Sequence, residues 1–123
     1  LGKFPIVVKD APGFLVNRCL APYLNEAARL WLEGNEPEHI DRIMLDFGMP
    51  MGPARLLDEI GYDVAMKVSE VLTRAFPERM QACPFFAAMV EAKALGKKAG
   101  GGLFDASGKQ PGPGRAVLAR LRI

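Results

Sequence analysis

Apolar side chains recur at the three- and four-residue spacing of an α-helix along most of the chain, and the longest such stretch covers residues 14–33. Its apolar positions form one broad stripe: Leu20, Leu24, Ala27, Ala28 and Trp31. Pro22 lies inside this stretch, and because its ring removes a backbone hydrogen bond we expect a kink there. Gly34 and Asn35 are typical residues for the end of a helix. The pattern therefore predicts a long first helix that packs Trp31 into the core.

Four shorter helices are predicted after it, over residues 37–47, 53–60, 63–75 and 84–95. Pro37 and Pro53 stand at favoured first positions, whereas Gly48 and Gly61 stand at helix ends. Asp63 can cap the helix that follows it. We expect the apolar positions of the second and fourth helices to face the core: Ile40, Ile43, Met44, Phe47, Val64, Val68, Val71 and Leu72.

Both ends of the chain depart from the helical pattern. Residues 4–9 are predicted to form a short strand, and no second strand is predicted to satisfy its backbone groups. We expect this strand to pair with a domain outside this sequence, to pair with another copy, or to remain unpaired. Residues 106–123 are expected to form a linker rich in glycine and proline, then a basic stub too short for an independent helix. The predicted fold class is all-α: a single helical domain of about five helices over residues 11–105, with a stray N-terminal strand.

Composition narrows the functional classes. The 123 residues suit one domain, and although half of them are apolar, no apolar run is long enough to span a bilayer. A net charge of +2 is too small to indicate a polyanionic partner, and the few C-terminal arginines give little support for nucleic-acid binding. Two cysteines are too few for a disulfide framework, which favours a reducing compartment. Cys19 is expected to be buried at the flank of the apolar stripe.

Few residues are candidates for chemistry. Neither glycine-rich phosphate-binding signature is present, and one histidine with two distant cysteines cannot form a metal cluster. His39 lies in a polar helix start, where we expect it to be exposed, and Asp58 and Glu59 are interpreted as locally hydrogen-bonded or solvated carboxylates. The amide of Asn17 can donate and accept hydrogen bonds without ionising, or can bond a local carbonyl. Lys98 lies in a glycine-rich loop, where lysines are usually solvated.

An ordered set of short motifs extends over residues 3–105. The motifs are Lys9-Asp10-Ala11-Pro12-Gly13-Phe14, Val16-Asn17-Arg18, Pro22-Tyr23, Ile40-Asp41, Pro50-Met51-Gly52-Pro53, Leu56-Leu57-Asp58, Phe76-Pro77-Glu78-Arg79-Met80 and Gly96-Lys97-Lys98-Ala99-Gly100. The set resembles the C-terminal domain of 3-hydroxyacyl-CoA dehydrogenases, and most of all that of the multifunctional α-subunits of fatty acid oxidation complexes. One departure is Gly102-Leu103-Phe104, where the family usually has Gly-Phe-Tyr or Gly-Phe-Trp.

The resemblance implies a helical domain of an enzyme that oxidises 3-hydroxyacyl-CoA to 3-oxoacyl-CoA with NAD in fatty acid β-oxidation. Residues 1–10 would then be the exit strand from a dinucleotide-binding domain that is absent here, and that domain would hold most of the NAD. The resemblance also implies that Asn17 is catalytic, because it helps to position the reacting group of the acyl-CoA. Lys98 would bind the cofactor across the domain interface. The histidine–glutamate pair that moves the proton lies in the absent domain, so we expect this chain to be inactive alone.

The resemblance also implies partners. They are the 3-hydroxyacyl-CoA substrate, the dinucleotide-binding domain, a second copy in a homodimer and a thiolase subunit; composition adds the expectation of no nucleic acid and no membrane span. The expected location is the bacterial cytoplasm, or a mitochondrion or peroxisome if the source is eukaryotic. The alternative function is a non-catalytic helical dimerisation module, which the apolar stripe and the unpaired strand also favour.

Overall fold

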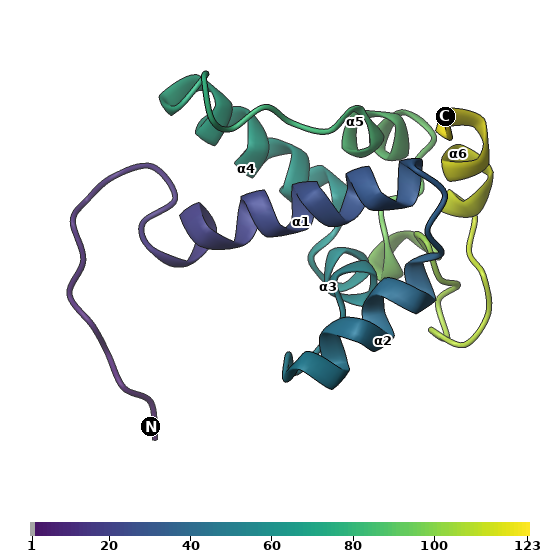
Figure 1. Cartoon of the computed structure of the whole chain (residues 1–123), viewed down its shortest axis with the longest axis horizontal. Coiled ribbons are helices and arrows are strands. Elements are labelled where there is room, and N and C mark those ends of the chain that lie inside the picture. Colours follow the sequence, from purple (N-terminus) through teal and green to yellow (C-terminus); the bar gives the residue numbers. More distant parts are fainter. Residues whose placement is uncertain (1) are drawn as a thin grey trace.

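The computed structural model describes residues 2–123, and its regular elements there are all helices (Figure 1). They are α1 (Val16–Leu32), α2 (Pro37–Phe47), α3 (Pro53–Ile60), α4 (Tyr62–Ala75), α5 (Pro84–Glu91), the short 3-10 helix η1 (Lys97–Ala99) and α6 (Gly114–Leu121). The predicted all-α fold class is confirmed. None of the helices in residues 2–123 combines the length and the apolar character needed to cross a bilayer.

Proline and glycine set most of the helix boundaries. Pro37 and Pro53 occupy the first turns of α2 and α3, where the missing backbone N–H costs nothing. Gly48 and Gly61 end these two helices at φ angles of +124° and +95°, which residues with a Cβ rarely adopt. Pro22 lies inside α1 without ending it.

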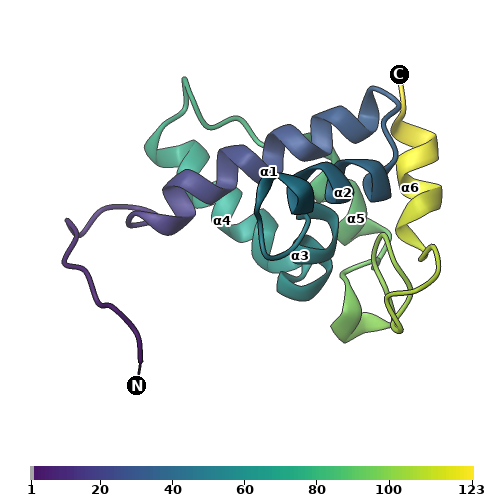
Figure 2. The ribbon, with the colours of Figure 1, turned by 60° about the horizontal axis from the view of Figure 1, so that its bottom comes forward.

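Helices α2, α3, α5 and α6 gather around the C-terminal half of α1, whereas α4 runs back toward its N-terminal end (Figures 1 and 2). Trp31, Tyr62 and Phe85 are fully buried at the centre of this arrangement. The ring of Phe85 lies edge-on to both neighbours, with centroids 5.8 Å from Trp31 and 5.7 Å from Tyr62. Such edge-to-face contacts add to the apolar burial. Trp31 is a core residue, as the sequence pattern predicted.

The C-terminal segment is more ordered than the sequence pattern predicted. Residues 114–121 form α6, whose Val117 and Leu118 are buried in the core cluster. The preceding residues are not a free linker either, because Phe104 and Pro111 form an antiparallel bridge. A helix this short is marginal in isolation, so its packing against the domain is what stabilises it.

The N-terminal segment and the outer helix faces differ from expectation. Residues 2–9 form no strand and are exposed, and among residues 2–123 no strand is available to pair with them. Cys19 is exposed rather than buried, because the buried residues of α1 start only at Leu24. The apolar side chains that were expected to face the core but are exposed are Ile43, Phe47, Val64 and Val71.

Candidate functional site

A tight turn brings the chain into α1. The backbone N–H of Phe14 donates to the carbonyl of Ala11 at 2.9 Å. Gly13 and Phe14 both have positive φ angles, +78° and +50°, so α1 cannot include them and starts at Val16 instead of residue 14. A Cβ on Gly13 would lie 2.9 Å from Cδ2 of Leu72, so a side chain there would displace Leu72 of α4, and the φ of +78° disfavours one in addition. The turn places Asn17 in the first turn of α1.

Asn17 is exposed, and no hydrogen bond of residues 2–123 involves its side chain. The local carbonyl bond that the sequence left open is therefore not formed. Asn17 lines a groove of about 190 Å³ between α1, α3 and α4. The other lining residues are nearly all apolar: Leu20, Ala21, Leu24, Leu57, Ile60, Val64, Ala65, Val68, Ser69 and Phe86. A single unpaired amide beside an apolar wall is the arrangement of a pocket that orients one polar group of a ligand.

Lys98 lies in η1, and its ammonium Nζ is 2.7 Å from Oδ1 of Asp63 at the start of α4. This ion pair lowers the pKa of the Asp63 carboxyl, chiefly through the hydrogen bond from Lys98. Lys98 does not line the Asn17 groove. The two predicted site residues are connected through α4, whose first turn contributes Asp63 to the ion pair and Val64 to the groove.

The glycine-rich loop that carries Lys98 closes on the buried side chain of Asp58. Its two carboxylate oxygens accept the backbone N–H groups of Leu103 at 3.0 Å and Phe104 at 2.8 Å. A Cβ on Gly96 or Gly102 would collide with Asp58, so both glycines are required for the approach. Burial raises the pKa of Asp58, and the two N–H groups only partly oppose that effect. Asp58 is thus not the local or solvated carboxylate that the sequence suggested.

Leu103 does not disturb this loop, although it replaces the aromatic residue usual in the family. Its side chain is fully buried in the core cluster, and both its backbone N–H and its backbone carbonyl form hydrogen bonds. The N–H donates to Asp58, and the carbonyl accepts a hydrogen bond from Nε of Arg115 at 2.7 Å. The loop is therefore held at position 103 by hydrogen bonds to Asp58 and Arg115.

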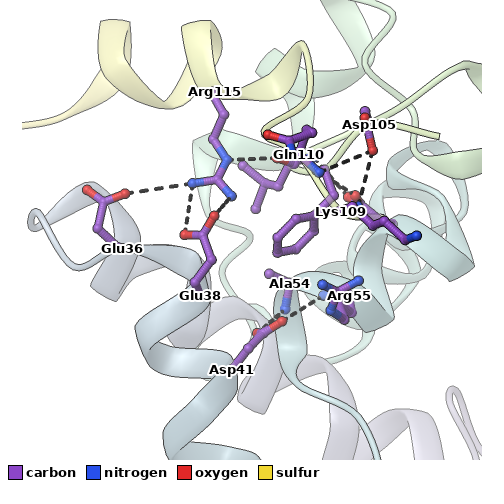
Figure 3. Close-up of polar contacts among 12 residues, drawn as sticks. Glu36, Glu38, Asp41, Ala54, Arg55, Asp105, Lys109, Gln110 and Arg115 are labelled. Carbon is purple, nitrogen blue, oxygen red and sulfur yellow. Dashed lines mark hydrogen bonds and ion pairs between the residues drawn. The ribbon is translucent and has the colours of Figure 1, made fainter. Parts of the chain in front are cut away.

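A second buried aspartate fixes α3 in the same way. Asp41 accepts the backbone N–H groups of Ala54 at 2.8 Å and Arg55 at 3.2 Å (Figure 3). These N–H groups belong to the first turn of α3, which no residue next to it in sequence caps. Burial raises the pKa of Asp41, opposed in part by the same two N–H groups. Asp41 therefore ties α2 to α3.

Arg115 connects α6 to α2 on the other side of the loop. Its guanidinium pairs with Glu38 through two hydrogen bonds and lies 3.7 Å from Glu36 (Figure 3). The guanidinium carbons of Arg55 and Arg115 lie 4.5 and 5.2 Å from the centre of the Phe104 ring. The contacts of this cluster hold the loop and α6 against α2 and α3, which is a structural role.

The other two titratable candidates, His39 and Glu59, lie at the surface. His39 is exposed on α2, as expected. Glu59 forms an exposed pair with Lys97 at 3.2 Å. Over residues 2–123, no group of three or more histidine, cysteine, aspartate or glutamate side chains is arranged to hold a metal ion.

Sequence reasoning missed the buried aspartates and the partner of Lys98. A signal for Asp58 was present: it follows Leu57 directly and Ala54 by four positions, so it lies on the buried face of its helix. A carboxylate on such a face requires hydrogen-bond partners. No pattern named those partners, because they lie more than forty positions away in a loop.

Comparisons with known proteins agree with one another. Residues 13–106 match the family model described as 3-hydroxyacyl-CoA dehydrogenase, C-terminal domain. The chain is 54% identical over 97 residues to the fatty acid oxidation complex subunit alpha of Idiomarina loihiensis, which covers 79% of this chain and 14% of that protein. Over 109 residues it is 47% identical to the subunit alpha of Shewanella halifaxensis, covering 89% of this chain and 15% of the relative.

Solved structures show the same fold. The crystal structure of (S)-3-hydroxybutyryl-CoA dehydrogenase from Ralstonia eutropha matches with a TM-score of 0.79 and 43% identity, over 85% of this chain and 38% of the other. The 3-hydroxybutyryl-CoA dehydrogenase from Escherichia coli K12 matches with a TM-score of 0.80 and 37% identity, over 90% of this chain and 24% of the other. This chain thus spans about one seventh of the length of the subunits alpha that it matches.

Proposed function

Because the chain belongs to the family of 3-hydroxyacyl-CoA dehydrogenase C-terminal domains, we propose that it supplies the substrate-holding half of an NAD-dependent 3-hydroxyacyl-CoA dehydrogenase of fatty acid oxidation. The family match over residues 13–106 confirms the resemblance that the motifs predicted. The relatives are several times longer than this chain, so the oxidation itself would belong to a larger protein.

The observation that carries this proposal is the free amide of Asn17 beside an apolar groove. An amide can donate to a carbonyl oxygen and accept from a hydroxyl, so it can hold the oxygen at C3 in both the alcohol and the ketone. Holding that oxygen orients the reacting carbon for the proton and hydride transfers. The apolar wall of the groove suits the hydrocarbon part of an acyl chain. His39, the sole imidazole, does not line the groove, so the base would come from another domain.

The proposed role of Lys98 is to contact NAD. Its ammonium is about half exposed, and an exposed point charge with three donors suits a phosphate or a ribose hydroxyl. Residues 2–123 contain no strand–turn–helix that could cradle a dinucleotide, so Lys98 fits as one contact and not as a complete site. NAD, when bound by the neighbouring domain, accepts the hydride; the part of this chain is to hold and orient.

The domain boundaries follow from the same proposal. Residues 1–10 would pair with the dinucleotide-binding domain and residues 11–105 would form the helical domain, to which α6 of residues 106–123 adds its buried Val117 and Leu118. The exposed apolar side chains of Phe4, Ile6 and Val7 support the first assignment, because a partner domain would cover them. A thiolase subunit and a second copy remain proposed partners.

A second candidate function is a non-catalytic dimerisation module. It is favoured by the exposed apolar side chains of α2 and α4, among them Phe47, which is 79% exposed, and Val71. This candidate needs no role for Asn17, so a variant at that position separates the two functions.

The test exchanges the matching 97 residues of the Idiomarina loihiensis subunit alpha for those of this chain, and assays 3-hydroxyacyl-CoA oxidation. Asn17→Ala should lower turnover by roughly 100-fold, the scale of losing one preorganised hydrogen-bond donor, while the NAD dissociation constant changes less than twofold. Gln81→Ala removes another exposed amide, whose side chain makes no hydrogen bond within residues 2–123, and serves as the matched control. Unchanged turnover in Asn17→Ala would refute the catalytic assignment.

The isolated chain gives a second test. Without a general base and a dinucleotide fold it should oxidise no 3-hydroxyacyl-CoA, even at saturating NAD. Sedimentation of the same sample measures association: a stable dimer combined with an inert Asn17→Ala exchange would favour the dimerisation module.

A further inference from the structure

The ion pair between Lys98 and Asp63 is shorter and less exposed than the neighbouring ion pair of the same loop. Nζ of Lys98 lies 2.7 Å from Oδ1 of Asp63, and the two side chains are 46% and 35% exposed. The neighbouring pair between Lys97 and Glu59 is longer, at 3.2 Å, and more exposed, at 61% and 49%. The two pairs involve consecutive lysines of the same loop, so they allow a direct comparison.

Gly61 provides the space in which the Lys98 side chain lies. A Cβ at Gly61 would be 2.8 Å from Cε and Nζ of Lys98 and from Oδ1 of Asp63. Any side chain there would displace the pair, and the φ of +95° disfavours a side chain in addition. The end of the lysine side chain therefore lies directly over Gly61, at the junction of α3 and α4.

The dipole of α4 alone would not keep the ammonium in this place. The start of α4 carries the positive end of the helix dipole, which repels a cation. Asp63, in the first turn of α4, is the carboxylate that reverses this preference. An exposed pair adds little to folding stability, so its main effect is on where the lysine points.

The backbone beneath Lys98 is already fixed relative to α4. The N–H of Tyr62 donates to the carbonyl of Leu95 at 2.8 Å. Gly96 and Gly101 exchange two backbone hydrogen bonds, at 3.1 and 2.9 Å, which close the turn around Lys98. The freedom left to Lys98 is in its side-chain rotamers, and holding them in advance lowers the entropy lost on binding a ligand.

We infer that Asp63 is a positioning residue for Lys98: it holds the ammonium over Gly61, where that ammonium contacts the cofactor. This inference rests on the proposed function, because it takes the contact between Lys98 and NAD as given. It adds a role for Asp63 and for the absence of a side chain at Gly61, and it assigns none to the pair of Lys97 and Glu59.

The first test measures the pair without any cofactor. In the 123-residue chain, NMR titration of the carboxyl carbon of Asp63 should give a pKa below the ordinary aspartate range. Lys98→Gln should raise that pKa toward the ordinary range, whereas Lys97→Gln should leave it where it was. An Asp63 pKa that does not respond to Lys98→Gln would overturn the inference.

The second test measures NAD binding in the exchanged subunit alpha by titration calorimetry. Asp63→Asn should weaken NAD binding by roughly two- to tenfold, the scale of ordering one flexible side chain. Glu59→Gln removes the same charge from the neighbouring pair and should change binding less than 1.5-fold. Asp63→Glu keeps the charge and should recover part of the loss. Equal or tighter binding in Asp63→Asn would refute the positioning role.

The two proposals fail in different ways. If Lys98→Ala weakens NAD binding but Asp63→Asn does not, Lys98 contacts the cofactor without help from Asp63, and only the present inference is lost. If neither variant changes NAD binding, the cofactor role of Lys98 itself is lost. Circular dichroism of each variant before titration separates both outcomes from misfolding.

Discussion

The carboxylate of Asp58 accepts the backbone N–H of Phe104 at 2.8 Å across 46 positions of sequence. The other oxygen accepts the N–H of Leu103, so the glycine-rich loop ends on one buried side chain that is 7% exposed. The loop that carries Lys98 is thereby attached to α3, the helix whose end leads into α4. A carboxylate of this kind affects both folding and the placement of the proposed cofactor contact.

Asp58→Asn should therefore destabilise the fold. An amide offers one acceptor oxygen and presents an NH₂ group to the second backbone donor, so one buried N–H loses its partner. We expect the free energy of unfolding to fall by about 1–3 kcal/mol at pH 7, the usual cost of an unsatisfied buried group. Urea denaturation followed by circular dichroism measures this loss. Asp46→Asn, on the exposed side of α2, should change stability little. An equal effect in both variants would show that the hydrogen bonds of Asp58 to Leu103 and Phe104 do not stabilise the fold.

The same carboxyl makes stability depend on pH. Burial raises the pKa of Asp58 above its ordinary value of 3.8, so the folded chain binds this proton more tightly than the unfolded chain. The stability that comes from this tighter proton binding is therefore complete below pH 3.8 and is lost as pH rises through the raised pKa, which leaves the hydrogen-bond contribution at pH 7. The stability advantage of the unsubstituted chain over Asp58→Asn should shrink from that pH towards neutrality. Urea titrations at several pH values test this, and an advantage that grows with pH would reverse the assigned shift.

Arg115 should matter more than its neighbour on the same helix. Its guanidinium bonds the carbonyl of Leu103 and the carboxylate of Glu38, whereas Arg120 is exposed and makes neither contact. Arg115→Ala should lower the free energy of unfolding by about 1.5–3 kcal/mol, the range for hydrogen bonds to charged groups. Arg120→Ala should stay within about 0.5 kcal/mol of the unsubstituted chain, as exposed substitutions usually do. Thermal and urea unfolding of both variants measure these losses. Equal losses in the two variants would show that the contacts of Arg115 do not stabilise the fold.

The two cysteines should react at different rates. Cys19 is exposed on α1, whereas Cys83 is buried and its pKa is raised by burial. Because the thiolate is the reactive form, Cys19 of the folded chain should react quickly with one equivalent of an aromatic disulfide reagent. Cys83 should react with a second equivalent only on unfolding. Cys19→Ser should abolish the fast phase. Two fast equivalents, or none, would contradict the exposure found at position 19.

The sequence predicted the elements better than their surroundings. Proline and glycine act on the backbone locally, so Pro37, Gly48, Pro53 and Gly61 identified the limits of α2 and α3 correctly. Helix α6 was not predicted, because its eight residues depend on packing that local propensity does not contain. Phe47 and Cys19 were assigned to the interior for the related reason that helical spacing identifies an apolar face without showing what covers it.

The candidate site was predictable as single residues but not as a set of contacts. The family motifs marked Asn17 and Lys98, and both lie at the surface where a neighbouring domain can reach them. The catalytic and cofactor roles themselves stay predictions. The functions of Asp41, Asp58 and Asp63 depend on hydrogen bonds and ion pairs between distant segments, which spacing along the chain does not reveal.

Helix α1 also sets a length scale. Its 17 residues correspond to about 25 Å, and the last residue of the chain is hydrogen-bonded to its far end through the carbonyl of Leu32. The N-terminal segment leaves from the opposite end (Figure 2). A fluorophore attached ahead of Val16 and one attached after Ile123 would thus lie at opposite ends of this helix. The distance between the two fluorophores would report any bending of α1.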